Sequence, residues 1–240
     1  MEQGRVILLT GCPGTGKSTV AALVAERLAL ARSVLLQADD FYEFLCKGAL
    51  PPYLPQAQQQ NQVLARALAA AANSFALGGY DVVVDGVVGP WLIEPWLQLA
   101  REGRPVHYIL LRAGKEETMA RALGRDKLDK SLNARLVEVM WEQFQGLGAY
   151  EPYGLDTTRL CAEETARLVL ERVESKKALL PPAARDKGEN SPERERRKAS
   201  RRPERRPAKR IICAPWPGRI EQRKKEKVFL GCHKKPPQVL

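Results

Sequence analysis

The stretch GCPGTGKST, from Gly11 to Thr19, decides how the rest of this 240-residue sequence is interpreted. It follows RVILLT at residues 5–10, a continuously apolar run that predicts a buried β-strand. It runs into VAALVAERLAL at residues 20–30, whose apolar residues recur with helical spacing. We therefore expect a glycine-rich loop between a strand and a helix over residues 17–30.

The loop matches the pattern G-x-x-x-x-G-K-[ST]. Glycines let successive backbone N–H groups point inward toward an anion, and the start of the following helix adds a partial positive charge. In such a loop the lysine reaches the β and γ phosphates, and the hydroxyl that follows it ligates Mg²⁺. Nucleotide phosphates are therefore expected to contact Gly11, Cys12, Pro13, Gly14, Thr15, Gly16, Lys17, Ser18 and Thr19. Nothing in the sequence marks Cys12 as an activated thiol, so it is interpreted as a filler of the loop.

Strand-like and helix-like runs alternate along the first three quarters of the chain. Further strands are expected at residues 33–37, 80–85, 105–111 and 153–157, and further helices at 56–77, 91–102, 115–123, 131–147 and 162–175. Apolar strands that alternate with helices are typical of a parallel sheet covered on both faces. The sequence thus predicts the α/β class, with a three-layer α/β/α fold around a five-stranded sheet.

Polar side chains follow the expected strands at the edge where such sheets bind ligands. Asp39 and Asp40 follow the second strand, Asp85 the third, Arg112 the fourth and Asp156 the fifth. Because the carboxyl ends of parallel strands share one edge, we expect these side chains near the glycine loop.

The carboxylates of this edge suggest chemistry on a phosphoryl group. A hydroxyl that attacks phosphorus needs a positioned acceptor for its proton, and a carboxylate serves. Asp40, expected on a loop after the second strand, is the candidate base. Ser18, Asp39 and Asp85 are the candidate ligands of Mg²⁺. The aspartate pair could instead cap a helix, and Asp85 could hold substrate hydroxyls.

Arg121 and Arg125 lie four residues apart and share one face of the helix expected there. Two guanidinium groups at the tip of a lid could neutralise the charge on a transferring phosphoryl group. A solvated arginine stripe is the alternative, and Arg112 could equally form an ion pair at the edge of the core.

The net charge of +11 is concentrated in the last quarter of the chain. Residues 181–240 hold 19 of the 39 Lys and Arg and 7 of the 28 Asp and Glu, whereas residues 1–180 have a net charge of −1. This Pro- and Arg-rich composition predicts a disordered tail after an ATP-binding domain at residues 1–180. A basic tail can bind nucleic acid or an anionic surface, and a solvated extension is the alternative.

Cysteine usage and hydropathy predict a compartment. The five cysteines are widely spaced and form no C-x-x-C pair, which favours reduced thiols over disulfides or a zinc site. No signal peptide is expected, and no apolar run is long enough to cross a bilayer. The prediction is a cytoplasmic protein.

At these motifs the chain resembles, over about residues 4–175, the P-loop kinases of the nucleoside-monophosphate-kinase type, which share an AAA-type ATP-binding domain. It is similar in particular to the branch that includes chloramphenicol phosphotransferase, shikimate and gluconate kinases and zeta-toxin-like kinases. The resemblance implies the sheet order 2-3-1-4-5, and ATP with Mg²⁺ as cofactors. It also implies that Asp40 is the base and that Arg121 and Arg125 are lid arginines.

Together these features predict Mg²⁺-dependent transfer of the ATP γ-phosphoryl group to a hydroxyl of a small molecule, with Lys17, Asp40, Arg121 and Arg125 as catalytic residues. Residues 47–61, where these kinases build their acceptor pocket, match no known acceptor signature. Tyr42, Tyr53 and Trp91 could line that pocket or belong to the core. A polynucleotide 5′-hydroxyl kinase assisted by the tail, and a non-kinase ATP-binding switch module, remain alternatives.

Overall fold

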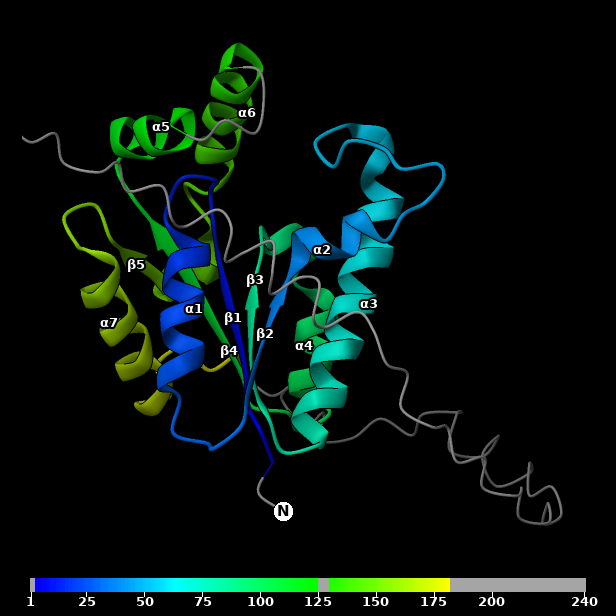
Figure 1. Ribbon diagram of the computed structural model, residues 1–240, viewed down its shortest axis with the longest axis vertical. Coiled ribbons are helices and arrows are strands. Elements are labelled where there is room, and N and C mark those ends of the chain that lie inside the picture. The colour runs from blue at the N-terminus through cyan, green and yellow to red at the C-terminus, as the bar shows by residue number, and fades with distance from the viewer. Residues whose placement is uncertain (1–2, 125–129, 182–240) are drawn as a thin grey trace, which may run out of the picture. The chain divides into compact units, whose positions relative to one another are not determined.

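The computed structural model describes residues 3–124 and 130–181, which form a five-stranded parallel sheet with helices on both faces (Figure 1). The strands are β1 (Val6–Gly11), β2 (Ser33–Gln37), β3 (Asp81–Asp85), β4 (Val106–Arg112) and β5 (Gly154–Asp156). Their order is β2-β3-β1-β4-β5, and each neighbouring pair is parallel. The predicted class and the order implied by the resemblance are both confirmed.

The helices form the two outer layers and the rim of the sheet. Figure 1 shows α1 (Lys17–Arg27) and α7 (Ala162–Glu174) against one face, and α3 (Gln58–Leu77) and α4 (Glu94–Arg101) against the other. Near the carboxyl ends of the strands lie α2 (Ala38–Glu43), α5 (Lys115–Leu123) and α6 (Lys130–Gln143). Three 3-10 turns, at Pro55–Ala57, Pro90–Leu92 and Gly148–Tyr153, complete the described elements. Among the described residues, every helix is too short or too polar to span a bilayer.

The central strands are buried throughout because both of their faces are covered. In β1, Val6 and Leu8 pack with α3 and α4, whereas Ile7 and Leu9 pack with α1 and α7. This alternation follows from the two-residue period of a strand. Each fully buried aliphatic side chain of this kind contributes about 2 kcal/mol to folding.

An ion pair fixes the amino ends of the strands. The Arg5 backbone N–H donates to Asp81 Oδ1 at 2.8 Å, and the Arg5 Nη2 group donates to Asp81 Oδ2 at 2.7 Å. Asp81 is fully buried, so this partner offsets the cost of removing its carboxylate from water. The hydrogen bond to Asp81 is the main cause that raises the pKa of Arg5 above its ordinary value. The pair therefore locks the start of β1 against the start of β3.

The structure corrects one local expectation at the site. Asp39 and Asp40 do not lie on a loop but in the first turn of α2, directly after β2. The segment ADDFYE is too short for apolar periodicity to predict a helix, yet acidic residues in a first turn are favoured by the helix dipole. Residues 182–240 lie outside the described part, so the tail and the domain boundary at residue 181 stay predictions.

Candidate functional site

The glycine loop joins β1 to α1 and has a backbone that only glycine adopts readily. Gly14 and Gly16 have φ angles of 91° and 86°, in the left-handed region. A Cβ atom on Gly14 would lie 2.4 Å from the Thr118 carbonyl oxygen, so α5 packs tightly on this point of the loop. A Cβ atom on Gly16 would meet nothing within 4 Å. The loop is thus closed toward α5 and open at its junction with α1.

The amino terminus of α1 has no side-chain cap within the described residues, and its first turn contains no acidic residue. Ser18 and Thr19 are exposed there. By contrast, α7 begins with a capping box made by Cys161 and Glu164. Uncapped N–H groups and the positive end of the helix dipole are what an anion needs, so the residues present fit a phosphate.

Lys17 is held against the loop by the carbonyl group of Cys12. The Lys17 ammonium donates to the Cys12 carbonyl oxygen at 3.0 Å, and the Lys17 residue is only 8 % exposed. The Thr15 hydroxyl and backbone N–H donate to the same oxygen at 2.9 and 3.3 Å. One carbonyl group therefore organises the loop and keeps a positive charge beside it. This arrangement fits the polyphosphate of a nucleotide.

Cys12 links the loop to α6. Its Sγ atom donates to the Val137 carbonyl oxygen at 3.5 Å, and the side chain packs with Leu110, Ala122 and Phe144. Burial raises the pKa of the Cys12 thiol to about 11, although the nearby Lys17 charge opposes this. A protonated thiol is a poor nucleophile, which agrees with the expectation of a filler. The contact with α6, 125 residues away, carries no sequence signal.

The end of β3 touches the start of α2. Asp85 lies opposite Leu9 of β1 and Gln37 of β2, and it is 7 % exposed. A Cβ atom on Gly86 would lie 2.6 Å from the Ala38 Cβ atom. The two segments that carry Asp85 and the pair Asp39 and Asp40 are therefore in contact, as the shared strand edge predicts. Asp39 is exposed and Asp40 is partly buried.

These carboxylates do not form a dense cluster. The part of the chain that the structure describes contains no group of three or more His, Cys, Asp or Glu side chains that could hold a metal ion. Mg²⁺ usually keeps several waters and needs only one or two protein carboxylates beside substrate phosphates. Such a sparse donor set fits Mg²⁺ better than a metal with an all-protein cage. The assignment of Ser18, Asp39 and Asp85 as its ligands stays a prediction.

The predicted arginines have different surroundings. The Arg121 Nη2 group pairs with Glu117 Oε1 at 2.8 Å along α5, and Arg125 lies outside the described residues. The lid role of both stays a prediction. Arg112 donates to both Glu151 carboxylate oxygens, at 2.6 and 2.9 Å, and these bonds are the main cause that lowers the pKa of Glu151 to about 2. The ion-pair alternative for Arg112 is therefore confirmed.

Trp141 attaches α6 to the rim of the sheet. Its Nε1 group donates to the Ala113 carbonyl oxygen at 3.0 Å, just beyond the end of β4. The Lys115 ammonium at the start of α5 donates to Glu138 of α6 at 2.6 Å. These contacts hold α5 and α6 beside the glycine loop. No motif in the sequence marks Trp141, because its role depends on a partner 28 residues away.

On the other side of the site, polar side chains fasten the segment after α2 to α3. Gln60 makes two hydrogen bonds to the backbone of Leu50, at 2.9 and 2.8 Å. Asn61 donates to the Pro52 carbonyl oxygen at 2.8 Å and accepts from the Tyr42 hydroxyl at 3.0 Å. Burial, followed by the charge of Asp39, raises the pKa of Tyr42. Tyr42 is therefore near Asp39, one of the candidate ligands of Mg²⁺.

Two aromatic residues of the same region are not part of the core. Tyr53 is 48 % exposed and Trp91 is 49 % exposed, so the interpretation of either as a core residue is wrong. The sequence could not decide this because an aromatic residue in a turn has no periodic neighbours that indicate its burial. The expectation that they line an acceptor pocket stays a prediction.

Comparison with known proteins gives one family and several relatives. Residues 7–140 match the model of a family described as an AAA domain. A UPF0200 protein of Aeropyrum pernix is 30 % identical over 132 residues, which cover 53 % of this chain and 68 % of that protein. A cytidylate kinase of Archaeoglobus fulgidus is 30 % identical over 122 residues, which cover 48 % of this chain and 66 % of that protein. The chain thus spans about two thirds of the length of each relative.

A solved structure has the same fold. The APS kinase of Mycobacterium tuberculosis in complex with AMPPNP and APS superposes with a TM-score of 0.53 and 22 % identity. The match covers 72 % of this chain and 99 % of that one. Together with the sheet order, it shows that the described residues adopt a P-loop kinase fold.

Proposed function

Because this chain belongs to the AAA domain family and has a P-loop kinase fold, we propose that it transfers the γ-phosphoryl group of ATP to a hydroxyl group of a small molecule. P-loop kinases of this kind use ATP with Mg²⁺. The observation that carries the proposal is the contact between the end of β3 and the start of α2, beside a glycine loop with an uncapped helix. This arrangement supports a phosphate site that has carboxylates on one side and the Lys17 ammonium on the other.

On the ATP side, the backbone N–H groups of residues 14–19 and the Lys17 ammonium would bind the phosphates. The Ser18 hydroxyl and the carboxylate of Asp39 or Asp85 would hold Mg²⁺, which would neutralise phosphate charge. Arg121 and Arg125 would add positive charge at the transferring group once the Arg121 guanidinium leaves Glu117.

On the acceptor side, Asp40 would accept the proton of the attacking hydroxyl. The negative net charge of residues 38–61, from α2 to the start of α3, supports a neutral or cationic acceptor. Residues 38–61 contain three acidic residues, Asp39, Asp40 and Glu43, and one basic residue, Lys47. An acceptor that already carries a phosphate group would be repelled by this balance, whereas an alcohol would not.

A nucleotide acceptor is the second candidate, and the cytidylate kinase relative favours it. In that case a phosphate oxygen of a nucleoside monophosphate would attack, and no proton acceptor would be needed. Phosphorus NMR separates the two, because an alcohol gives a phosphate monoester and a nucleotide gives a phosphoanhydride. Nucleoside monophosphates and a panel of hydroxylated metabolites and antibiotics are therefore the acceptors to compare.

Replacement of Asp40 tests the base directly. With an alcohol acceptor, Asp40→Asn should lower kcat by about 10²- to 10⁴-fold and leave the affinity for ATP nearly unchanged. Glu43→Gln on the exposed end of the same helix is the matched control and should keep kcat. Equal losses in both variants, or loss of ATP binding by Asp40→Asn, would contradict the assignment.

Two further outcomes would identify the remaining alternatives. ATP binding with slow hydrolysis and no phosphorylated acceptor in the whole panel would favour the switch module. Phosphorylation of oligonucleotide 5′ ends that falls steeply with salt would favour the polynucleotide kinase.

A further inference from the structure

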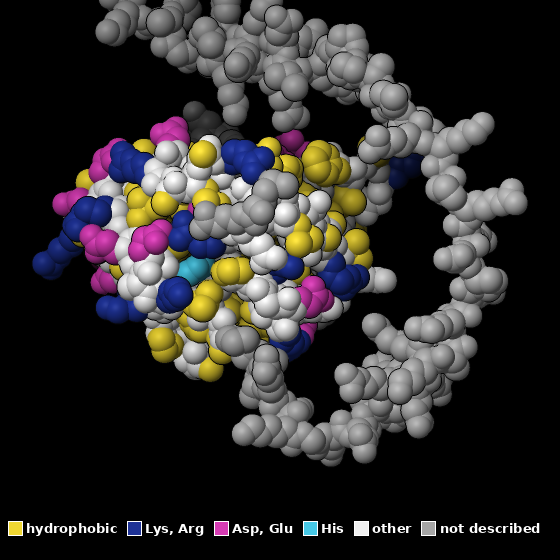
Figure 2. Space-filling view, turned by 90° about the horizontal axis from the view of Figure 1, so that it is seen from below, with side chains coloured by type: hydrophobic (Ala, Val, Ile, Leu, Met, Phe, Trp, Pro, Cys, Tyr) yellow, Lys and Arg dark blue, Asp and Glu magenta, His cyan; other side chains and the backbone are white. Residues whose placement is uncertain are grey.

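A hollow lies at the opposite edge of the sheet from the glycine loop. It has a volume of about 400 Å³, within the range of small-molecule sites. Its polar lining consists of Arg5, Arg104, His107, Glu174 and Lys176, and we call it the amino-edge pocket. Figure 2 looks onto this edge and shows the cyan histidine side chain among dark-blue basic and yellow apolar side chains.

Backbone hydrogen bonds fix the walls of the amino-edge pocket. After α7 the chain turns at Lys176, whose φ of 58° is in the left-handed region. It then runs beside β4, where the Tyr108 N–H donates to the Ala178 carbonyl oxygen at 2.7 Å. The Leu180 N–H donates to the Val106 carbonyl oxygen at 2.8 Å. The turn at Lys176 is therefore fixed above His107 rather than free.

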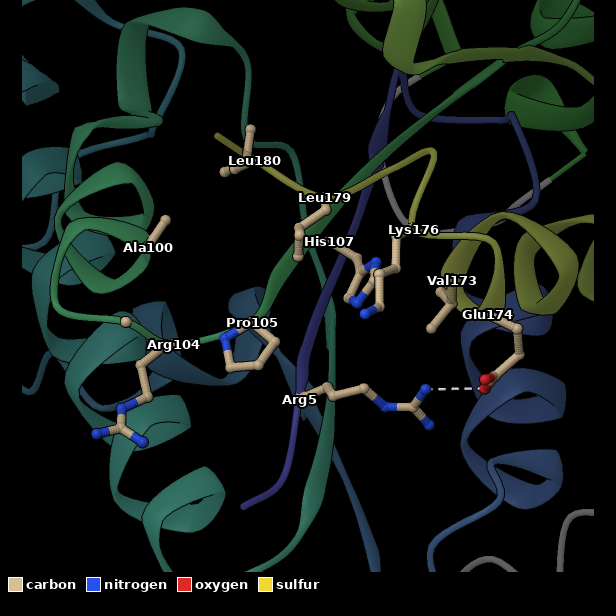
Figure 3. Close-up of a pocket in the computed structure, with 11 residues that line it drawn as sticks. Arg5, Ala100, Arg104, Pro105, His107, Val173, Glu174, Lys176, Leu179 and Leu180 are labelled. Carbon is tan, nitrogen blue, oxygen red and sulfur yellow. Dashed lines mark hydrogen bonds and ion pairs between the residues drawn. The ribbon is translucent and has the colours of Figure 1, made fainter. Parts of the chain in front are cut away.

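Buried polar atoms in this pocket have no partner within residues 3–124 and 130–181. His107 is 2 % exposed, and its Nδ1 atom makes no hydrogen bond there. The Nε and Nη1 atoms of Arg104 are also buried and unpartnered. A buried polar group without a partner costs about 1–3 kcal/mol, so a ligand that supplies acceptors gains by pairing them. Figure 3 shows His107 and Lys176 next to each other, whereas the Arg104 guanidinium lies beyond Pro105 and points away from them.

The charges around the amino-edge pocket leave one positive charge in excess. Arg5 is paired with the buried Asp81 and with Glu174, at 2.7 and 2.8 Å. Arg104 and Lys176 add two positive charges, so three cations face two carboxylates among the described residues. A single negative charge restores neutrality, whereas a phosphate dianion would exceed it.

The remaining lining is apolar. It consists of Ala100, Gly103, Pro105, Val173, Leu179 and Leu180. We propose that the amino-edge pocket binds a small molecule with one carboxylate group on an apolar body, with the carboxylate against His107 and Lys176. This site is separate from the proposed kinase chemistry, because its lining includes no residue of the glycine loop or of α2.

The protonation state of His107 supports this ligand class. Burial, followed by the charge of Arg5 and more weakly that of Lys176, lowers its pKa to about 4. Glu174 and Asp81 oppose this effect. At neutral pH the ring is therefore uncharged and can donate one N–H group to a carboxylate oxygen. A bound carboxylate would favour the charged ring and raise the pKa of His107.

Histidine-ring NMR on the full chain tests the proposal without a kinase assay. The chain has two histidines, so the His233→Asn variant leaves the His107 signal alone. Hexanoate should shift the His107 ring signals saturably and raise the pKa of His107. Hexanol, which lacks the charge, and inorganic phosphate should each bind at least about tenfold more weakly, because each lacks one of the two features that the lining matches.

A neighbouring lysine pair supplies the matched variants. Lys176→Gln should weaken hexanoate binding about fivefold, whereas Lys177→Gln, next to it but outside the lining, should not change it. No shift of the His107 signals with hexanoate, equal binding of hexanol, or equal weakening in both lysine variants would overturn the proposal. Tighter binding of phosphate than of hexanoate would overturn the carboxylate class.

Discussion

Acidification should destabilise this protein through His107 before its carboxylates titrate. The unfolded chain has a histidine pKa of about 6.5, and burial lowers the pKa in the folded state to about 4. Between these values the unfolded state binds a proton that the folded state does not. The stabilising contribution is therefore fully present above the unfolded pKa and is lost as the pH falls toward the folded one.

The size of the effect follows from the difference between the two pKa values. One pKa unit corresponds to about 1.4 kcal/mol, so complete protonation would remove about 3 kcal/mol from the free energy of unfolding. Between about pH 7 and about pH 5, roughly 2 kcal/mol of this is lost. The carboxyl groups of Glu138, Glu151, Asp156 and Glu164 have lowered pKa values, so they lose their contribution at more acidic pH.

Urea unfolding at a series of pH values, in buffers without carboxylates, measures this loss. The slope of the unfolding free energy against pH is compared between the wild-type chain, His107→Asn and His233→Asn. The first variant should flatten the slope between about pH 5 and about pH 7, because His107 is buried with an unpaired nitrogen. The second variant removes the other histidine of the sequence and serves as the comparison. If His107→Asn keeps the wild-type slope, the buried neutral imidazole is not the cause and the reasoning fails.

Three further predictions concern other parts of the fold. Gly14→Ala should lower the free energy of unfolding by at least about 2 kcal/mol and abolish ATP binding, because the new Cβ atom would lie 2.4 Å from the Thr118 carbonyl oxygen. Gly48→Ala has a similar φ but open surroundings, so it should lower the free energy of unfolding by only about 1 kcal/mol. Thermal or urea unfolding measures both losses. Asp81→Asn should lower the free energy of unfolding by about 3–5 kcal/mol, because Arg5 keeps a partly buried charge without its buried partner. Glu174→Gln removes the exposed partner of the same arginine and should cost at most about 1 kcal/mol. Similar losses in the two variants would show that burial of the partner does not set the cost. Iodoacetamide should label Cys46 and Cys161 well before Cys12, because Cys12 is buried and its thiol has a pKa of about 11. Peptide mass spectrometry measures the three labelling rates. Equal rates would contradict the prediction and show that the loop opens readily from α6.

The sequence predicts the sheet well because its signal is local. The strands expected at residues 33–37, 80–85 and 105–111 agree with β2, β3 and β4 to within one residue at each end. β3 and β4 are buried on both faces and β2 is a partly buried edge strand, and continuous apolar runs identify all three. The glycine loop was equally predictable, because its spacing is set by backbone geometry.

The features that escaped prediction depend on distant or very short segments. Helix α2 has only six residues, so the aspartate pair was expected on a loop. The pairing of Arg112 with Glu151 joins residues 39 apart, so the sequence predicted an ion pair for Arg112 only as one of two alternatives and did not identify its partner. The amino-edge pocket gathers Arg5, His107 and Lys176 from three separate segments. No local pattern marks such encounters, because they arise only when the layers pack.

The packing of Cys12 has a consequence for protein engineering. Among the described residues, α5 and α6 share their apolar cluster with the glycine loop and with Leu110 of β4. A graft that exchanges only these two helices would leave the loop cysteine facing a foreign surface. Chimaeras between relatives should therefore move the loop, the end of β4 and both helices as one cassette.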